Sequence, residues 1–196
     1  MNPRDVKARL LEHQALLSGH FQLSSGKHSN RYLQCAVALQ HPDTAAELGG
    51  ALARRVRGRL GSSPHVVVSP AMGGLIIGHE TGRALGTRAC FTERIDGKMV
   101  LRRGFHLQPG ERVLLVEDVV TTGLSSRETL EVIRAGGGKP VAVGCIANRS
   151  QGSEVDGLPL LSLLDLDVEA WKPERCPLCA DSGGAGPAIK PGSRIV

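Results

Sequence analysis

Aromatic residues are scarce in this 196-residue sequence, at 3% of the chain. Proteins that stack single-stranded nucleic acid on aromatic side chains need more of them, so the composition argues against that class. No apolar run approaches the roughly 20 residues of a membrane-spanning helix. The charged N-terminus, MNPRDVKARLLEHQ, lacks the apolar core of a signal peptide. We therefore expect neither a nucleic-acid partner nor a membrane partner.

Blocks of like charge are also absent, although the net charge is +5. The five cysteines are an odd number and lie mostly in apolar stretches, which favours reduced thiols in a cytoplasmic protein. Cys176 and Cys179 have the spacing of half a zinc site. No second cysteine pair or nearby histidine pair completes that site in the sequence, so a structural or tolerated pair is the favoured interpretation.

Short apolar runs alternate with helical patterns along most of the chain. Strands are expected at 65–70, 88–93, 111–120, 140–149 and 158–166. Helices are expected at 5–17, 42–60, 74–85 and 126–138. The alternation predicts an α/β fold with a mostly parallel central sheet flanked by helices. Ligands bind such sheets beyond the carboxyl ends of the strands, here residues 69–74, 117–125 and 148–152.

The richest pattern is VLLVEDVVTTGLSS, residues 113–126. A buried strand ends in two adjacent acids, Glu117 and Asp118, and hydroxyl residues then surround Gly123 at the start of a helix. Backbone amides and a helix N-terminus can hold a phosphate there, while the acids can accept sugar hydroxyls or hold a hydrated cation. The pattern favours a sugar phosphate with Mg²⁺. The alternative is an ordinary capped turn.

This stretch resembles the ribose-phosphate signature of the type I phosphoribosyltransferases, and within that family the chain is most similar to the orotate enzymes. Further resemblance lies in FQLSSGKHSNRYLQC (21–35), VVVSPAMGG (66–74) and CIANRS (145–150). The resemblance implies one domain over residues 1–171 with the type I fold. It also implies a small N-terminal hood (1–40), a mobile loop (94–106) and an irregular tail (172–196).

The implied reaction transfers the ribosyl 5-phosphate group of phosphoribosyl pyrophosphate (PRPP) to orotate, in pyrimidine synthesis. Mg²⁺ is the implied cofactor, held through PRPP and not by a certain protein ligand. The residues expected to bind PRPP are Glu117, Asp118, Val119, Val120, Thr121, Thr122, Gly123, Leu124, Ser125, Ala71 and Gly73. Thr121 and Arg149 are expected to bind orotate. An ion pair from Arg149 to a surface acid such as Glu154 is the structural alternative.

A basic segment between the second and third expected strands is the candidate mobile loop. Its candidate catalytic residues are Arg94, Lys98, Arg102 and Arg103, which would close over pyrophosphate and exclude water. In the family this loop reaches the neighbouring subunit, so a homodimer with shared active sites is expected. An exposed hairpin turning at Asp-Gly is the alternative.

Three rival functions remain at this stage. A purine or xanthine phosphoribosyltransferase is one, although Thr121 replaces the acid typical of hypoxanthine enzymes. A PRPP-sensing regulator is another, and a spare helix-turn-helix region for it is not evident. A P-loop NTPase lacks the required G-x-x-x-x-G-K-[ST]. The chain also has Gly73 and Ser24 where many orotate enzymes carry lysines, so the charge contacts of those lysines are in doubt.

Overall fold

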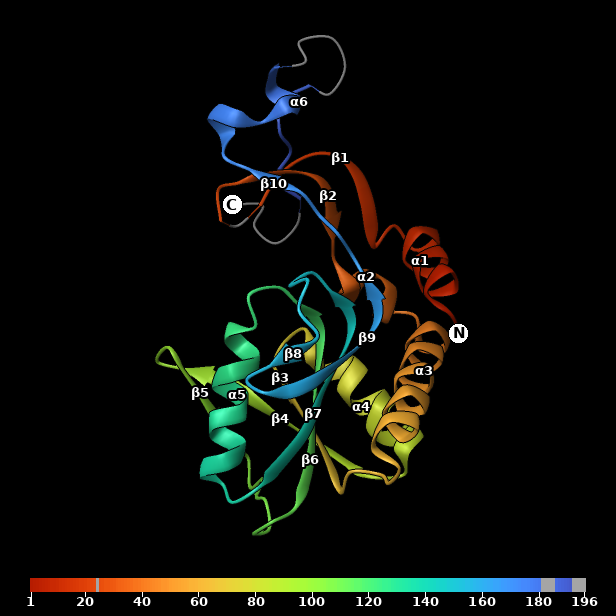
Figure 1. Ribbon diagram of the computed structural model, residues 1–196, viewed down its shortest axis with the longest axis vertical. Helices are drawn as coiled ribbons and strands as arrows, with labels where there is room; N and C mark the ends of the chain where they lie inside the picture. The colour runs from red at the N-terminus through yellow and green to blue at the C-terminus, as the bar shows by residue number, and fades with distance from the viewer. Residues whose placement is uncertain (24, 181–185, 192–196) are drawn as a thin grey trace.

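The computed structural model describes residues 1–23, 25–180 and 186–191. Its main body is a seven-stranded sheet in the order β5-β4-β3-β6-β7-β9-β8 (Figure 1). The strands are β3 (Val66–Pro70), β4 (Arg88–Ile95), β5 (Lys98–Leu101), β6 (Arg112–Val120), β7 (Lys139–Asn148), β8 (Glu154–Val155) and β9 (Leu158–Asp165). The five central strands are parallel, and β5 and β8 are antiparallel at the edges.

Helices cover both faces of this sheet, which explains the continuous apolar runs in its strands. The helices are α3 (Pro42–Leu60) and α4 (Gly74–Leu85) on one side and α5 (Leu124–Ala135) on the other (Figure 1). Alternate residues of β6 point into the two cores, with Leu114 packed among α3 and α4 residues and Leu115 among α5 residues. The predicted α/β class and mostly parallel sheet are confirmed. No helix among the described residues is long and apolar enough to cross a membrane.

The first helix is shorter than its sequence pattern predicts. Helix α1 spans Pro3–Glu12, and Asn2 caps it by accepting hydrogen bonds from the backbone amides of Arg4 and Asp5. The expected helix to residue 17 is wrong, because Leu16 and Leu17 belong to a strand that pairs with Leu33 and Tyr32. Tertiary pairing here overrides the local helical pattern.

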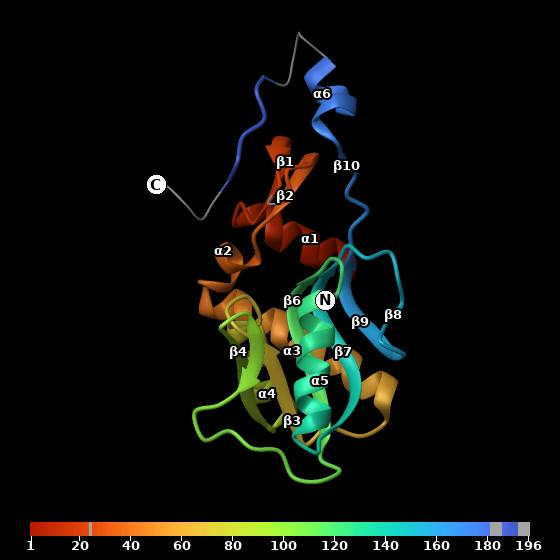
Figure 2. The same ribbon diagram turned by 90° about the vertical axis from the view of Figure 1, so that its left-hand side faces the viewer.

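A second, three-stranded sheet forms the N-terminal hood. Its strands are β1 (Leu16–Gln22), β2 (His28–Leu33) and β10 (Ala170–Trp171), in the order β1-β2-β10. The helix α2 (Cys35–Leu39) leads from the hood to α3. Figures 1 and 2 both place the hood beyond the carboxyl ends of the main parallel strands. It therefore faces the loops that the sequence singles out.

The segment after β10 is more ordered than an irregular tail. It contains a 3-10 helix (Pro173–Arg175) and a short helix α6 (Pro177–Ala180). Farther along, Ile189 lies beside β1, accepting a hydrogen bond from the Gln22 amide and donating one to the His20 carbonyl, each 2.8 Å long. Residues 181–185 and 192–196 of the expected tail lie outside the described residues. The tail thus returns to the hood.

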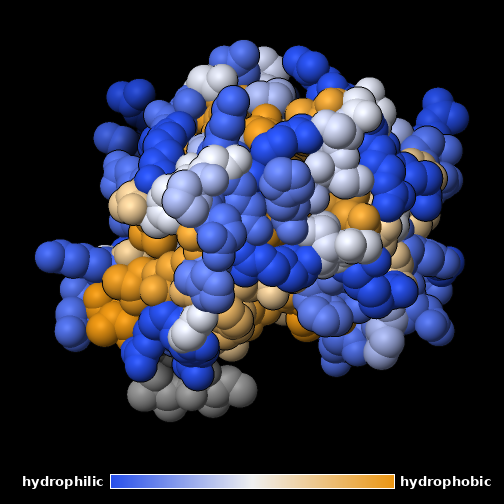
Figure 3. Space-filling model, turned by 90° about the horizontal axis from the view of Figure 1, so that it is seen from below, coloured by the Kyte–Doolittle hydropathy of each residue, from blue (hydrophilic) through white to orange (hydrophobic). Residues whose placement is uncertain are grey.

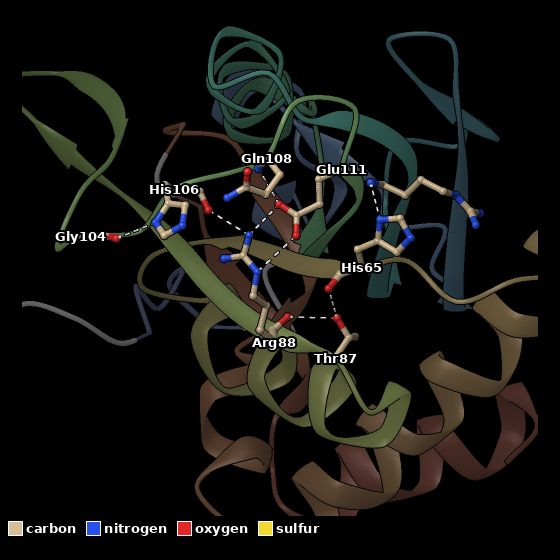
Figure 4. A network of polar contacts seen from close by, with 8 residues as sticks. His65, Thr87, Arg88, Gly104, His106, Gln108 and Glu111 are labelled. Carbon is tan, nitrogen blue, oxygen red and sulfur yellow. Dashed lines mark hydrogen bonds and ion pairs between the residues drawn. The ribbon is translucent and has the colours of Figure 1, made fainter.

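The face opposite the hood is mostly hydrophilic, with apolar residues gathered toward one side (Figure 3). This end of the molecule carries the amino ends of the parallel strands. A polar network joins them there: Arg88, at the start of β4, pairs with Glu111, just before β6, at 2.6 Å (Figure 4). The sheet is thus fastened at the end away from the candidate site.

Candidate functional site

The last part of strand β6 brings two carboxylates toward the carboxyl edge of the sheet. Glu117 is 5% exposed, and its Oε1 accepts hydrogen bonds from the hydroxyls of Ser125 (2.7 Å) and Ser126 (3.3 Å). The Asp118 carboxylate is half-buried and accepts a hydrogen bond from the Val119 amide at 2.8 Å. The first turn of α5 therefore positions Glu117. The sequence pattern does not reveal this contact between the serine hydroxyls and Glu117.

Burial shapes the charge of these acids. Loss of solvation raises the pKa of the Glu117 carboxyl to about 7, and the neighbouring Asp118 charge adds to this effect. The hydrogen bonds from Ser125 and Ser126 oppose it by stabilising the carboxylate. Burial also raises the pKa of Asp118. A cation, or ligand hydroxyls that donate to these oxygens, would stabilise the charged forms.

Gly123 shapes the loop between the acids and the helix. Its φ of +72° is left-handed, a conformation that glycine adopts without strain. Thr121 and Thr122 are exposed and Leu124 begins α5, so the loop presents backbone amides and threonine hydroxyls at a helix N-terminus. The positive end of the helix dipole favours an anion at this point.

The loop between β3 and α4 packs against the same acids. Gly73 lies so close to Asp118 that an added Cβ would come within 2.6 Å of the carboxylate Oδ1. Ala71 precedes it, and the amide of Ala71 donates to the carbonyl of Thr92 on β4 at 2.7 Å. The structure thus brings two segments that are expected to bind PRPP, one at Gly73 and one at Asp118, into contact.

Arg149 emerges beside the phosphate loop, as its place after a strand predicts. The register pairs Val120 with Asn148, and the Arg149 amide donates to the Val120 carbonyl at 2.8 Å. Its Nε is buried and has no hydrogen-bond partner among the described residues. The alternative ion pair with Glu154 is absent from the same part of the chain. Burial lowers the pKa of the guanidinium, so an anion next to it would relieve an unfavourable environment.

The basic segment forms a hairpin, β4–β5, which turns at Asp96-Gly97 as the sequence alternative predicts. Both turn residues have positive φ, +47° and +79°. Arg94 pairs with Glu128 on α5, and Arg103 donates to Glu93 at 2.9 and 3.0 Å. The structure therefore separates these guanidinium groups instead of bringing them together.

The two other candidate catalytic residues also belong to this basic segment. Arg102 lies 3.5 Å from Glu93, and Lys98 is exposed on the edge strand β5. His106, farther along the same segment, lies in the network at the amino edge of the sheet, where its carbonyl accepts a hydrogen bond from Arg88 at 2.9 Å (Figure 4). Their catalytic roles and the mobility of residues 94–106 stay predictions.

The N-terminal motif forms the turn of the β1–β2 hairpin in the hood. The Leu23 amide donates to the Lys27 carbonyl, and the Gly26 amide donates to the Leu23 carbonyl, at 2.8 and 2.9 Å. Ser24, which stands where many orotate enzymes have lysine, lies outside the described residues. The hood thus holds this motif over the end of the molecule that carries Asp118 and Arg149 (Figure 2).

The donor set fits a Mg²⁺ ion carried by a phosphorylated sugar. Mg²⁺ prefers oxygen ligands, keeps several waters and commonly bridges substrate phosphates and one or two carboxylates. Glu117 and Asp118 supply carboxylates beside the amide-rich loop. A parallel sheet with a ribose-phosphate loop of this form defines a phosphoribosyltransferase.

Comparison with known proteins leads to the same class of protein. Residues 38–175 match the family model of the phosphoribosyl transferase domain. The chain is 52% identical to an orotate phosphoribosyltransferase of Heliobacterium modesticaldum over 92% of this chain and 93% of the relative. It is 49% identical to that of Desulforamulus reducens over the full length of both. The chain therefore belongs to the orotate phosphoribosyltransferase family.

Solved structures show the same architecture. The orotate phosphoribosyltransferase from Aeropyrum pernix superposes with a TM-score of 0.65 at 26% identity, over 82% of this chain and 93% of that one. The Mycobacterium tuberculosis enzyme in complex with PRPP has a TM-score of 0.64 at 26% identity, over 84% and 97%. The predicted family and fold are confirmed.

Proposed function

We propose that this protein is an orotate phosphoribosyltransferase that converts PRPP and orotate to orotidine 5′-monophosphate and pyrophosphate in pyrimidine synthesis. The main support is the placement of Arg149 beside the acid-ended phosphate loop. A sugar phosphate held by that loop would present its anomeric carbon near a guanidinium that the protein leaves without a partner at Nε. Orotate differs from uracil by a carboxylate, which a planar guanidinium can bind.

The chain's own groups have distinct parts in this reaction. The amides of 121–125 hold the 5-phosphate, with the hydroxyls of Thr121 and Thr122 beside them. Glu117 and Asp118 accept the ribose hydroxyls and fix the orientation of the ring. Ala71 and Gly73 line the pyrophosphate side. Positioning and charge stabilisation then lower the barrier to exchanging pyrophosphate for the orotate nitrogen, without a protein nucleophile.

Mg²⁺, when bound with PRPP, stabilises the negative charge that develops on departing pyrophosphate. Arg94, Lys98, Arg102 and Arg103 would turn toward that charge on closure of the hairpin. The three arginines would then leave their partners Glu128 and Glu93. These ion pairs are exposed, so breaking them costs little. Closure would keep water from the electron-poor sugar.

Two further features of the proposal concern the setting of the enzyme. We infer a homodimer in which the hairpin of one subunit serves the site of the other, as the resemblance implies. We also infer a cytoplasmic location. Buried free thiols at Cys35, Cys90 and Cys145 favour a reducing compartment.

Pyrophosphate release tests the proposal. The protein is incubated with PRPP, Mg²⁺ and one base at a time: orotate, uracil, hypoxanthine, xanthine or adenine. We expect pyrophosphate release with orotate and with none of the other bases. The variant Asp118→Asn should reduce this release strongly. Release with a purine would favour the rival enzyme, and PRPP binding without turnover of any base would favour the regulator.

A further inference from the structure

Four potential metal ligands from opposite ends of the chain meet in the hood. His20 and His28 come from the β1–β2 hairpin, and Cys176 and Cys179 come from the segment around α6. Their four ligand atoms all lie within 4.8 Å of one another. The spacing of Cys176 and Cys179 shows only half of a metal site, and the structure places two histidines from about 150 residues earlier in the chain beside them.

The spacing of these atoms matches a small tetrahedron. Two atoms bound to one zinc ion at about 2.0–2.3 Å lie about 3.3–3.8 Å apart in tetrahedral geometry. Nε2 of His20 is 3.6 Å from the Sγ atom of each cysteine. Nδ1 of His28 is 3.2 Å from Sγ of Cys179 and 2.9 Å from Nε2 of His20. Small shifts of the side chains, which shorten the distances of up to 4.8 Å and lengthen the 2.9 Å contact, would place all four atoms around one ion.

The surroundings prepare His20 for this role. Its Nδ1 is 2.9 Å from the carbonyl oxygen of Gly186, which can only accept, so Nδ1 carries the proton. Nε2 then directs its lone pair toward the other three ligand atoms. A backbone carbonyl that fixes the tautomer of a ligating histidine is a regular feature of zinc sites.

Charge also favours a dication here. His20, His28 and Cys176 are buried, and only Cys179 is exposed. Two thiolates and two neutral imidazoles around Zn²⁺ carry no net charge, so the occupied site is compatible with burial. We propose that His20, His28, Cys176 and Cys179 bind one structural zinc ion, which fastens the C-terminal segment to the hood.

The fastened region has few other supports. Strand β10 has two residues, Ala170 and Trp171, which pair with Ser29 and His28. The helix α6 has four residues. Such short elements gain little from their own hydrogen bonds, and a metal commonly supplies the missing stability in small substructures. The ion would thereby hold the hairpin that carries the N-terminal motif.

Metal analysis of the untagged full-length protein tests the proposal. Mass spectrometry of the elements should find about one zinc per chain, with iron, copper and nickel well below that level. The double variant Cys176→Ser/Cys179→Ser should lose the zinc. The matched control Cys90→Ser, which changes a cysteine in β4, should keep it. Iron at one per chain, or no metal in protein purified with reductant, would overturn the assignment of zinc.

Reconstitution gives a second readout that does not depend on activity. Reduced, metal-free protein should bind Zn²⁺ about nanomolar or tighter. Bound Co²⁺ should show the intense visible absorption of tetrahedral sites and thiolate-to-cobalt charge transfer. The variant His28→Cys should retain metal and raise that charge transfer by about half, because three thiolates replace two.

Two results of reconstitution would contradict the proposal. One is the absence of charge transfer when Co²⁺ is added to folded, reduced protein. The other is a disulfide between Cys176 and Cys179, seen as only three alkylated thiols in the protein denatured without reductant. The four side chains would then form a metal-free cluster, joined by hydrogen bonds or by that disulfide.

Discussion

Gly73 and Asp118 are in direct contact: a Cβ atom on Gly73 would lie 2.6 Å from Oδ1 and 2.8 Å from Oδ2 of the carboxylate. The carboxylate is not free to move away, since it accepts the Val119 amide and is half-buried. The contact couples the proposed pyrophosphate loop to the proposed ribose site. A change in one should therefore be measurable in the other.

Gly73→Ala should weaken PRPP binding by about tenfold or more, because the new methyl group displaces the Asp118 carboxylate from its hydrogen bond, worth roughly 1–2 kcal/mol. Calorimetric titration with PRPP and Mg²⁺ measures the effect. Gly58→Ala, in the helix α3 with nothing within 4 Å of the added atom, is the control and should bind normally. Equal affinities in the two variants would show that Asp118 does not bind the sugar.

Glu117 should make the protein less stable as pH rises from about 4.5 to 7. Its carboxyl has a pKa of about 7 in the folded protein, against 4.5 ordinarily. The folded state therefore holds more protons in this interval, and the free energy of unfolding falls as pH increases through it.

Glu117→Gln removes this contribution. The difference in unfolding free energy between the variant and the wild type should change by at most about 3 kcal/mol between pH 4.5 and 8, in favour of the variant at pH 8. Urea unfolding at several pH values measures it. A difference that stays constant over this range would place the Glu117 pKa near its ordinary value.

Gly123→Ala should impair both stability and phosphate binding. Its left-handed φ of +72° costs a non-glycine residue about 1–2 kcal/mol. Gly157→Ala is a matched control, since Gly157 has φ +75° and open space around it in the β8–β9 turn. Both variants should unfold more easily, but only Gly123→Ala should lose affinity for PRPP. Unaltered affinity in Gly123→Ala would place the phosphate elsewhere.

Arg149→Ala should lose roughly 1.5–3 kcal/mol of orotate binding, which is about a 10- to 100-fold rise in the Michaelis constant. PRPP affinity should hardly change. Arg149→Lys should recover little, because the ammonium lacks the planar fork. Arg134→Ala, which removes a surface arginine paired with Asp156, is the control. Wild-type kinetics in Arg149→Ala would make this arginine structural.

Mixed dimers test the sharing of active sites. One inactive partner carries Arg102→Ala and Arg103→Ala in the hairpin, and the other carries Asp118→Asn in the pocket. If the hairpin serves the neighbouring pocket, an equal mixture should recover about one quarter of wild-type activity, because half of the dimers then hold one intact site out of two. Failure to recover activity after verified subunit exchange would mean that each subunit works alone.

The parallel sheet could be predicted because its strands are buried on both faces. Val113–Val116 read as a continuous apolar run for that reason, and they form the centre of β6. The two acids that follow, Glu117 and Asp118, lie in the last part of the same strand. The register between β6 and β7 also places Arg149 next to the loop that follows β6, because parallel strands of similar length end at one edge of the sheet.

Other features depend on contacts that sequence spacing does not reveal. Ser125 and Ser126 donate to Glu117 only because α5 turns back over the end of β6. His20 and His28 show no helical or metal-motif spacing, since they come from the two strands of the β1–β2 hairpin. Their pairing with a cysteine pair near the other end of the chain follows from the path of the whole fold.

The position of β10 in the hood has a consequence for synthesis on the ribosome. The hairpin β1–β2 leaves the ribosome well before the strand β10 and Ile189, which complete its sheet. An isolated two-stranded hairpin is only marginally stable in water. The hood should therefore assemble after the parallel sheet, so nascent chains that stop short of residue 170 would carry a folded sheet and an unfinished hood.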